Sequence, residues 1–298
     1  MSFRKKVSQD LYPFKSRFVT INGHRLHYLD EGNGYPLLML HGNPSWSFYY
    51  RELIKKLRTG YRCIAPDHIG MGLSDKPSDS QYTYTLEQRV KDLEEFLIMI
   101  GITENITMIV HDWGGIIGMS YARHHSKQIK RIVLSNTAAF HLPEGKKLPF
   151  MLRLARSFVG RIAVRGFNAF NVGSTRIGVK RIKMSRQVKA GYTAPYDSWK
   201  NRIGIMRFVE DIPLKRGDPG YDYIQDVQDH LHLFKKNPVL IVWGLRDLVF
   251  DIHFLNKWIE YLPSAQINRF EDCGHYILED AQEEVGLLIT DFLKNTDD

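Results

Sequence analysis

The sequence predicts an α/β protein in which a mostly parallel twisted sheet is flanked by helices and interrupted by one helical insertion. Three observations lead to this class. Short apolar segments alternate with segments of helical periodicity through residue 139, this regularity fails over residues 140–233, and it returns from residue 234 to the end. We therefore expect a core domain at residues 1–139 and 234–298, and a basic, mostly helical cap domain at residues 140–233.

Each element of the core follows from a local pattern. The first two predicted strands form a hairpin-like pair ahead of a parallel series; the strands are expected at 17–21, 25–29, 37–40, 62–65, 106–110, 131–134, 239–243 and 266–270. Apolar residues recur near every 3.6 positions in the predicted helices, which are expected at 45–57, 86–100, 113–123, 254–261 and 283–293. Thr85 is placed to cap the second helix, and Gly101 lies just past its end.

Composition excludes several classes of protein. With 43% hydrophobic and 25% charged residues, the chain resembles an ordinary globular protein, and no apolar run approaches the about 18 residues of a membrane helix. The basic opening MSFRKKVSQD has no apolar segment behind it, which argues against a secretory signal. We expect Cys63 and Cys273 to be free thiols in a reducing, cytoplasmic setting. No metal or organic cofactor is implied.

The net charge of +8 is concentrated in the cap. Residues 141–190 contain twelve Lys and Arg against the single acid Glu144, so the remainder of the chain is slightly acidic. Within this block an apolar stripe at helical spacing is interleaved with cations; the stripe is Met151, Leu154, Ala155, Phe158 and Ile162, and the cations are Arg153, Arg156, Arg161 and Arg165. This pattern predicts either a solvated face over a packed cap helix or a docking surface for partner enzymes or an anionic membrane. Nucleic acid is not expected, because no binding motif is present.

One sequence motif predicts a catalytic nucleophile. The sequence HDWGG at residues 111–115 lies where an apolar strand gives way to a helix, and its small residues suit the tight turn that exposes a nucleophile. Asp112 occupies the central position of this turn, where related motifs carry serine, and Val110 replaces the first glycine of the usual G-x-S-x-G pattern. The alternative interpretation is that Asp112 only caps the helix beginning at Trp113.

A carboxylate nucleophile needs a general base and a group that orients the base. Asp247 follows a predicted strand, and His275 follows the last one, so the order along the chain is nucleophile, acid, histidine. This is the order found in α/β-hydrolases. Taken singly, Asp247 is equally well a turn residue and His275 a loop histidine, whereas together with Asp112 they form a predicted triad.

Three segments together resemble the haloalkane dehalogenase family of α/β-hydrolases: HGNP at 41–44, DHIGMGLSDKP at 67–77 and HDWGG at 111–115. The resemblance implies that Asp112 attacks an sp³ carbon, that His275 is the base and that Asp247 orients it. It also implies that Asn43 and Trp113 donate side-chain N–H groups to the leaving group. The alternatives are a loop asparagine in an Asx-turn and a core tryptophan. Asp67 and Asp75, in the second segment, are expected to shape a turn.

Four further segments, most of them in the cap or near the predicted base, point to one group of proteins within this family. Residues 136–140, 165–170, 192–196 and 274–280 resemble the β-lactone decarboxylases of bacterial long-chain olefin biosynthesis, which implies a hydrophobic cis-β-lactone as substrate. Three alternatives stay open. One is a haloalkane dehalogenase that releases halide and a primary alcohol. Another is an epoxide hydrolase with Tyr192 and Tyr196 as acids, against which Asn43 argues. The third is a non-catalytic binding protein of the same fold, against which the predicted triad argues.

Overall fold

All eight predicted strands are present in the computed structural model, which describes residues 7–296; residues 1–6 of the basic opening lie outside this range. Two strands match the prediction residue for residue, and the others extend by one to three residues at one or both ends, so the prediction of strands is confirmed. They are β1 (Arg17–Ile21), β2 (His24–Glu31), β3 (Pro36–Leu40), β4 (Arg62–Pro66), β5 (Ile106–Asp112), β6 (Ile129–Thr137), β7 (Val239–Gly244) and β8 (Gln266–Phe270).

The strands form one sheet in the order β1-β2-β4-β3-β5-β6-β7-β8. β2 pairs antiparallel with both β1 and β4, and every other pair is parallel. The central strand β5 is buried along its whole length, as expected of a parallel strand covered on both faces. Its carboxyl end therefore lies in the middle of the sheet edge, where open α/β sheets bind ligands.

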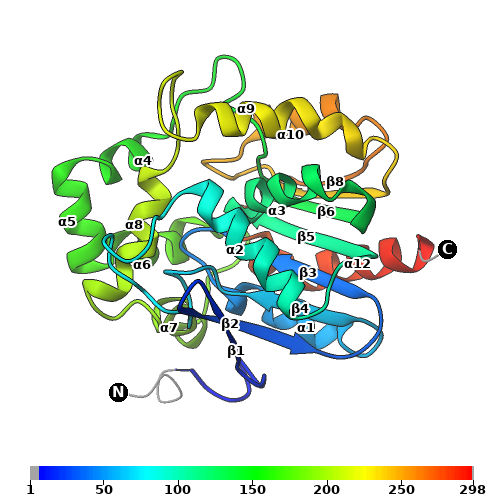
Figure 1. Cartoon of the computed structure of the whole chain (residues 1–298), viewed down its shortest axis with the longest axis horizontal. Coiled ribbons are helices and arrows are strands. Elements are labelled where there is room, and N and C mark those ends of the chain that lie inside the picture. The colour runs from blue at the N-terminus through cyan, green and yellow to red at the C-terminus, as the bar shows by residue number, and fades with distance from the viewer. Residues whose placement is uncertain (1–6, 297–298) are drawn as a thin grey trace.

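Helices cover both faces of the sheet (Figure 1). α1 packs beside α12 on one face, and α2, α3 and α9 pack together on the other. The last of these comes from the end of the inserted segment, so the chain has returned to the core before β7 begins. The core helices are α1 (Arg51–Leu57), α2 (Leu86–Met99), α3 (Trp113–His124), α9 (Tyr221–His230), α10 (Ile252–Tyr261), α11 (Ile277–Asp280) and α12 (Gln282–Asn295). Within residues 7–296, no helix has both the length and the apolar character needed to cross a membrane.

The helix expected over residues 45–57 is shorter than predicted. Residues Ser47–Tyr50 form a 3₁₀ turn, and α1 begins only at Arg51. Trp46 is extended and fully buried, and its indole N–H donates to the carbonyl of Gly191 at 3.1 Å. This contact with the cap outweighs the local helical pattern. At α2, in contrast, the prediction that Thr85 is the N-cap residue of the helix is confirmed, because the Thr85 side chain accepts the N–H of Gln88.

The inserted segment is mostly helical, as expected. Besides α9, which packs on the core, its α-helices are α4 (Phe150–Ala155), α5 (Phe158–Phe167), α6 (Ala169–Ile177), α7 (Arg186–Thr193) and α8 (Ile203–Glu210). The apolar stripe is divided between α4 and α5, so the alternative of one packed cap helix is wrong, and the docking surface stays a prediction. Ser157 ends the continuity because its side chain accepts the N–H of Gly160 and starts a new helix. Of the five stripe residues only Ala155 is buried.

Candidate active site

The turn between β5 and α3 holds Asp112 in a conformation that side chains rarely adopt. Its backbone has φ +52° and ψ −126°, and it is the last residue of β5 and the residue before the first of α3. The turn requires its glycines, because a Cβ on Gly114 would overlap the carbonyl of Leu40 and one on Gly115 would overlap the Thr137 hydroxyl. The Asp112 side chain caps no N–H of N2 or N3 in α3, so its carboxylate is left for another role.

Two backbone N–H groups hold the Asp112 carboxylate in place. Oδ1 accepts the N–H of Asn43 at 2.6 Å, and the N–H of Trp113 also points at the carboxylate. Gly42 brings the loop after β3 this close, because a Cβ there would overlap the carboxylate. Burial raises the pKa of Asp112, while His275 and the two N–H groups work in the opposite direction. The second oxygen, Oδ2, lies 3.7 Å from Nε2 of His275.

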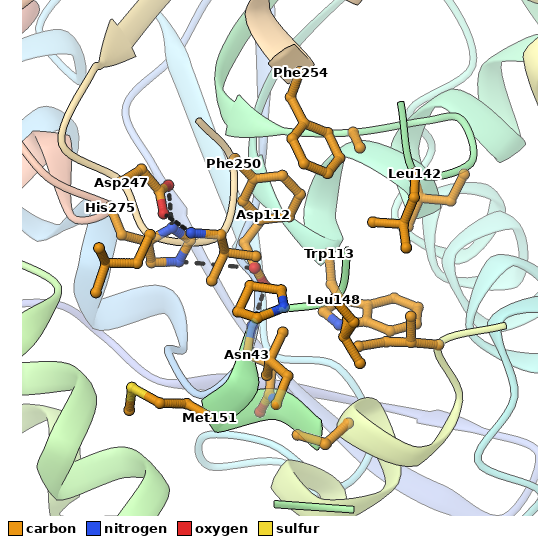
Figure 2. Close-up of a pocket in the computed structure, with 18 of the residues that line it drawn as sticks. Asn43, Asp112, Trp113, Leu142, Leu148, Met151, Asp247, Phe250, Phe254 and His275 are labelled. Atoms are coloured by element: carbon orange, nitrogen blue, oxygen red, sulfur yellow. Dashed lines mark hydrogen bonds and ion pairs between the residues drawn. The ribbon is translucent and has the colours of Figure 1, made fainter. Parts of the chain in front are cut away.

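His275 joins the two predicted carboxylates. Its Nδ1 lies 2.7 Å from Oδ2 of Asp247, and the carbonyl of His275 lies 2.8 Å from Nε2 of His111. Burial is the largest single influence and would lower the pKa of His275, but the Asp247 and Asp112 carboxylates together outweigh it, so the pKa is raised. The structure therefore brings together the three residues that the sequence placed in a triad, in the relay order Asp112, His275, Asp247 (Figure 2).

Sequence reasoning gave no role to Asn136, which holds Asp247 in position. Its Nδ2 donates to Oδ2 of Asp247 at 3.0 Å, and its Oδ1 accepts the N–H of Gly244 at 2.9 Å. Asn136 is fully buried with φ +34°, at the carboxyl end of β6. The N–H of Val249 donates to the other oxygen of Asp247 at 2.8 Å. The available signal was a run of three polar residues, 135–137, at the carboxyl end of a strand.

Asn43 and Trp113 lie beside Asp112 at the same end of one cavity (Figure 2). One N–H of the Asn43 amide donates to the carbonyl of Ile205 at 3.1 Å, which fixes the amide against α8 of the cap. An amide nitrogen carries two hydrogens, so a second donor remains. The Trp113 ring packs on Phe208, also of α8, with ring centroids 5.0 Å apart.

The cavity has a volume of about 210 Å³ and lies between the carboxyl ends of the strands and the cap. Asn43, Trp113 and His275 supply polar groups beside Asp112. Apolar side chains from both domains make up most of the wall; these include Ile116, Leu142, Leu148, Leu152, Phe170, Ile212, Phe250 and Phe254. A wall of this kind suits a ligand with apolar arms and one reactive polar group.

Tyr192 and Tyr196 do not reach this cavity. The Tyr192 hydroxyl donates to Glu279 at 2.6 Å, and the Tyr196 hydroxyl donates to the carbonyl of Ser45 at 3.1 Å. Both side chains are fully buried, and neither lines the cavity. The hypothesis that they are paired acids facing a substrate is therefore wrong, because their hydroxyls are used to attach the cap to the core.

Asp67 also lies away from the cavity, at the turn it was expected to shape. Its buried carboxylate accepts the N–H groups of Ser47 and Leu73 and lies 2.8 Å from Nδ1 of His27. Burial opposes its ionisation, but these partners prevail and lower the pKa of Asp67 to about 2. Asp75, at the other end of this segment, accepts the N–H of Arg25 in β2. Across residues 7–296 no group of three His, Cys, Asp or Glu side chains is arranged to hold a metal ion.

Comparisons with known proteins agree with this geometry. Residues 35–173 match the family model described as alpha/beta hydrolase fold. The chain is 54% identical over 288 residues to a cis-3-alkyl-4-alkyloxetan-2-one decarboxylase of Shewanella oneidensis, covering 96% of this chain and 91% of the relative. It is 30% identical to haloalkane dehalogenase 2 of Mycobacterium tuberculosis, covering 97% of this chain and 98% of the relative.

Among solved structures, a haloalkane dehalogenase of Agrobacterium tumefaciens C58 superposes with a TM-score of 0.83 at 20% identity, covering 95% of this chain and 97% of the other. At this level of identity the superposition establishes the fold. The sequence relatives establish the family. The chain therefore belongs to the haloalkane dehalogenase family of the α/β-hydrolase fold, together with the cis-3-alkyl-4-alkyloxetan-2-one decarboxylases.

Proposed function

We propose that this protein is a cis-β-lactone decarboxylase that converts a 3,4-dialkyl-oxetan-2-one into a cis-alkene and CO₂. The observation that carries the proposal is a buried aspartate at the nucleophile turn, in a chain 54% identical to a protein named for this activity. The apolar wall of the cavity supports long alkyl arms on the substrate.

The first step is a displacement at the ring carbon that bears the ring oxygen. Asp112 Oδ2 forms a bond to this sp³ carbon, the bond from the carbon to the ring oxygen breaks, and the oxygen leaves as a carboxylate tethered to the neighbouring carbon. Asn43 and Trp113 supply N–H donors to this developing charge without adding a competing negative charge. A halide would leave by the same displacement, so weak dehalogenation is compatible with this site.

The second step releases both products. The bond between the neighbouring carbon and its carboxylate breaks to give CO₂, its electron pair becomes the second bond of the alkene, and the ester bond to Asp112 breaks. The aspartate returns as a carboxylate, and no water or oxidant is consumed. Inversion in the first step followed by anti loss in the second converts a cis-lactone into a cis-alkene.

His275 acts differently in the two forms of its ring. A neutral imidazole activates water, which would hydrolyse the Asp112 ester to a hydroxy acid. A protonated imidazole cannot do so, and it stabilises the Asp112 carboxylate as that group leaves carbon. In the ester the Asp247 carboxylate still acts to raise the pKa of His275 and so supports the protonated form, which favours loss of CO₂ over hydrolysis.

A parallel assay tests the proposal. The protein is given a cis-β-lactone, a 1-haloalkane and an epoxide, and alkene, hydroxy acid, halide and diol are measured. We expect alkene as the main product, and we expect Asp112→Asn to lower turnover by roughly 10⁴, as when a nucleophile is lost. Mass spectrometry of wild-type protein quenched during turnover should place an adduct on the peptide with Asp112. Vigorous halide release with little alkene would identify the protein as a haloalkane dehalogenase. Diol as the main product would overturn both the decarboxylase and the dehalogenase function.

The cellular setting is also part of the proposal. Cys63 and Cys273 are free and buried, which supports a reducing compartment such as the cytoplasm. For the basic cap, partner enzymes of an olefin-synthesis assembly and an anionic membrane were both expected from the sequence. Three of the four arginines interleaved with the apolar stripe make contacts within the cap itself. Arg156 donates to the carbonyls of Val209 and Ile212, Arg161 pairs with Glu210 at 2.7 Å, and Arg165 donates to the carbonyl of Trp199.

A further inference from the structure

Helix α5 has its small residues inside and its large apolar residues outside. Gly160 and Val164 face the protein, whereas Phe158 is 78% exposed, Val159 70% and Ile162 40%. A helix on the surface of a globular protein normally has the reverse arrangement. The outer side of α5 is therefore built to contact something apolar.

The same surface continues on α4, which packs beside α5. Phe150 is 67% exposed, and Met151 and Leu154 are each 49% exposed. We call these six residues the cap face: Phe150, Met151, Leu154, Phe158, Val159 and Ile162. Figure 1 shows α4 and α5 at the outer edge of the molecule, at the end opposite the C-terminus. Contiguous exposed apolar residues of this kind mark an interaction site.

The segment that forms the cap face carries charge of one sign, although Glu210 of the neighbouring α8 pairs with Arg161 of α5. No acidic residue occurs between Glu144 and Asp197, a stretch that contains α4, α5, α6 and α7. Arg153, on α4, is exposed and has no ion-pair partner among residues 7–296, and it lies over the ring of Phe150. An apolar face with cations around it complements an anionic lipid surface, whose headgroups pair with the cations while its acyl region receives the apolar side chains.

The cap face is also continuous with the cavity. Met151, half-exposed on the cap face, lines the cavity, and so does Leu152, which follows it in α4. Helix α4 thus contributes both to the apolar exterior and to the apolar wall of the cavity that contains Asp112. A dialkyl substrate, or an alkene product, would pass along this route without crossing water.

We propose that the cap face binds an anionic lipid bilayer and opens the cavity toward it. The apolar route rests on the proposed function, whereas membrane binding by the cap face does not. The protein would lie on the membrane with α4 and α5 in the headgroup region, and the sheet would stay outside the bilayer.

Sedimentation with vesicles tests this proposal on the full chain. We expect binding to vesicles of phosphatidylcholine and phosphatidylglycerol in equal amounts, and much weaker binding to pure phosphatidylcholine. The triple variant Phe158→Gln, Val159→Gln, Ile162→Gln should bind the anionic vesicles at least about tenfold more weakly, because its outer face is polar. None of these three residues lines the cavity. Arg153→Gln should weaken binding and reduce its sensitivity to salt.

A matched control changes exposed apolar residues far from the cap. Ile98 and Met99, at the end of α2, are 65% and 52% exposed, so Ile98→Gln with Met99→Gln should leave vesicle binding unchanged. Equal sedimentation of the triple variant and this control would overturn the proposal, as would failure of the wild type to bind. Wild-type dimers that dissociate in the triple variant, without vesicle binding, would assign the face to a second copy instead. Turnover of a short-armed lactone without vesicles, measured in parallel, reports separately on the proposed function.

Discussion

Asp112 combines a buried carboxylate with an unusual backbone conformation, and both have an energetic cost. Its backbone φ of +52° is rare for any residue other than glycine, and burial raises the pKa of its carboxyl. A raised pKa in the folded state means that folding disfavours the ionised carboxyl, so the native protein loses stability as the pH rises through this pKa. The site thus sacrifices stability in order to present a nucleophile to the cavity.

We therefore predict that Asp112→Asn, which keeps the shape and the accepting Oδ1, inactivates the enzyme and raises its melting temperature by a few degrees at pH 7. The gain should shrink as the pH falls through the pKa of Asp112, because the wild-type carboxyl then becomes neutral as well. Thermal unfolding by circular dichroism at several pH values measures both effects. Asp291→Asn, at an exposed carboxylate on α12, is the control and should change little. A lower melting temperature for Asp112→Asn would contradict this account.

At the scale of elements, the loop after β3 positions the nucleophile that the turn after β5 presents. The loop can approach because Gly42 has no side chain, and the N–H of Asn43 then reaches Oδ1 of Asp112. Adjacent parallel strands bring these two loops to the same sheet edge, since β3 pairs directly with β5. The carboxylate therefore depends on two loops that α1, β4 and α2 separate in the chain.

We predict that Gly42→Ala pushes the Asp112 carboxylate away from the Asn43 N–H and lowers kcat by roughly 10², the cost of losing one preorganised donor. Steady-state kinetics with the cis-β-lactone, together with circular dichroism to show that the fold persists, measure the effect. Gly173→Ala is a matched control on α6, where a new Cβ meets no atom within 4 Å and alanine favours the helix. Wild-type kcat in Gly42→Ala would refute the role of this loop.

At the scale of the molecule, one buried network attaches the cap to the N-terminal and the C-terminal segments of the core domain. Arg51 of α1 forms a bidentate ion pair with Glu279 of α11, with N–O distances of 2.5 and 2.9 Å. The hydroxyl of Tyr192 in α7 donates to the same carboxylate. The cap thus closes over the cavity through a polar contact sealed from water. Breaking one member of a buried pair leaves the other charge without compensation.

We predict that Glu279→Gln lowers the free energy of unfolding by about 3–5 kcal/mol, and that Tyr192→Phe lowers it by about 1–2 kcal/mol with little change in kcat. Urea denaturation and lactone turnover of the same samples distinguish the two effects. Glu87→Gln, in an exposed pair with Lys91, should cost less than about 1 kcal/mol. Loss of kcat in Tyr192→Phe at unchanged stability would mean that its hydroxyl takes part in the chemistry after all.

The strands, the helix cap at Thr85 and the turn at Asp112 were predictable from the sequence because each depends on neighbours in the chain. Apolar runs mark strands, a hydroxyl before a helix marks its start, and two glycines after an aspartate mark a turn too tight for side chains. The grouping of Asp112, Asp247 and His275 was also predictable, since each follows a strand and parallel strands end at one edge of the sheet.

The tertiary structure alone decided which polar side chains meet and which apolar side chains stay outside. Arg51 and Glu279 are 228 residues apart, and Asn136 and Asp247 are 111 apart, so no local pattern signals either contact. Helical periodicity likewise showed that the α5 segment has an apolar side but not what that side faces. Periodicity is a property of one helix, whereas burial depends on every element around it, and in α5 that environment leaves Phe158 exposed.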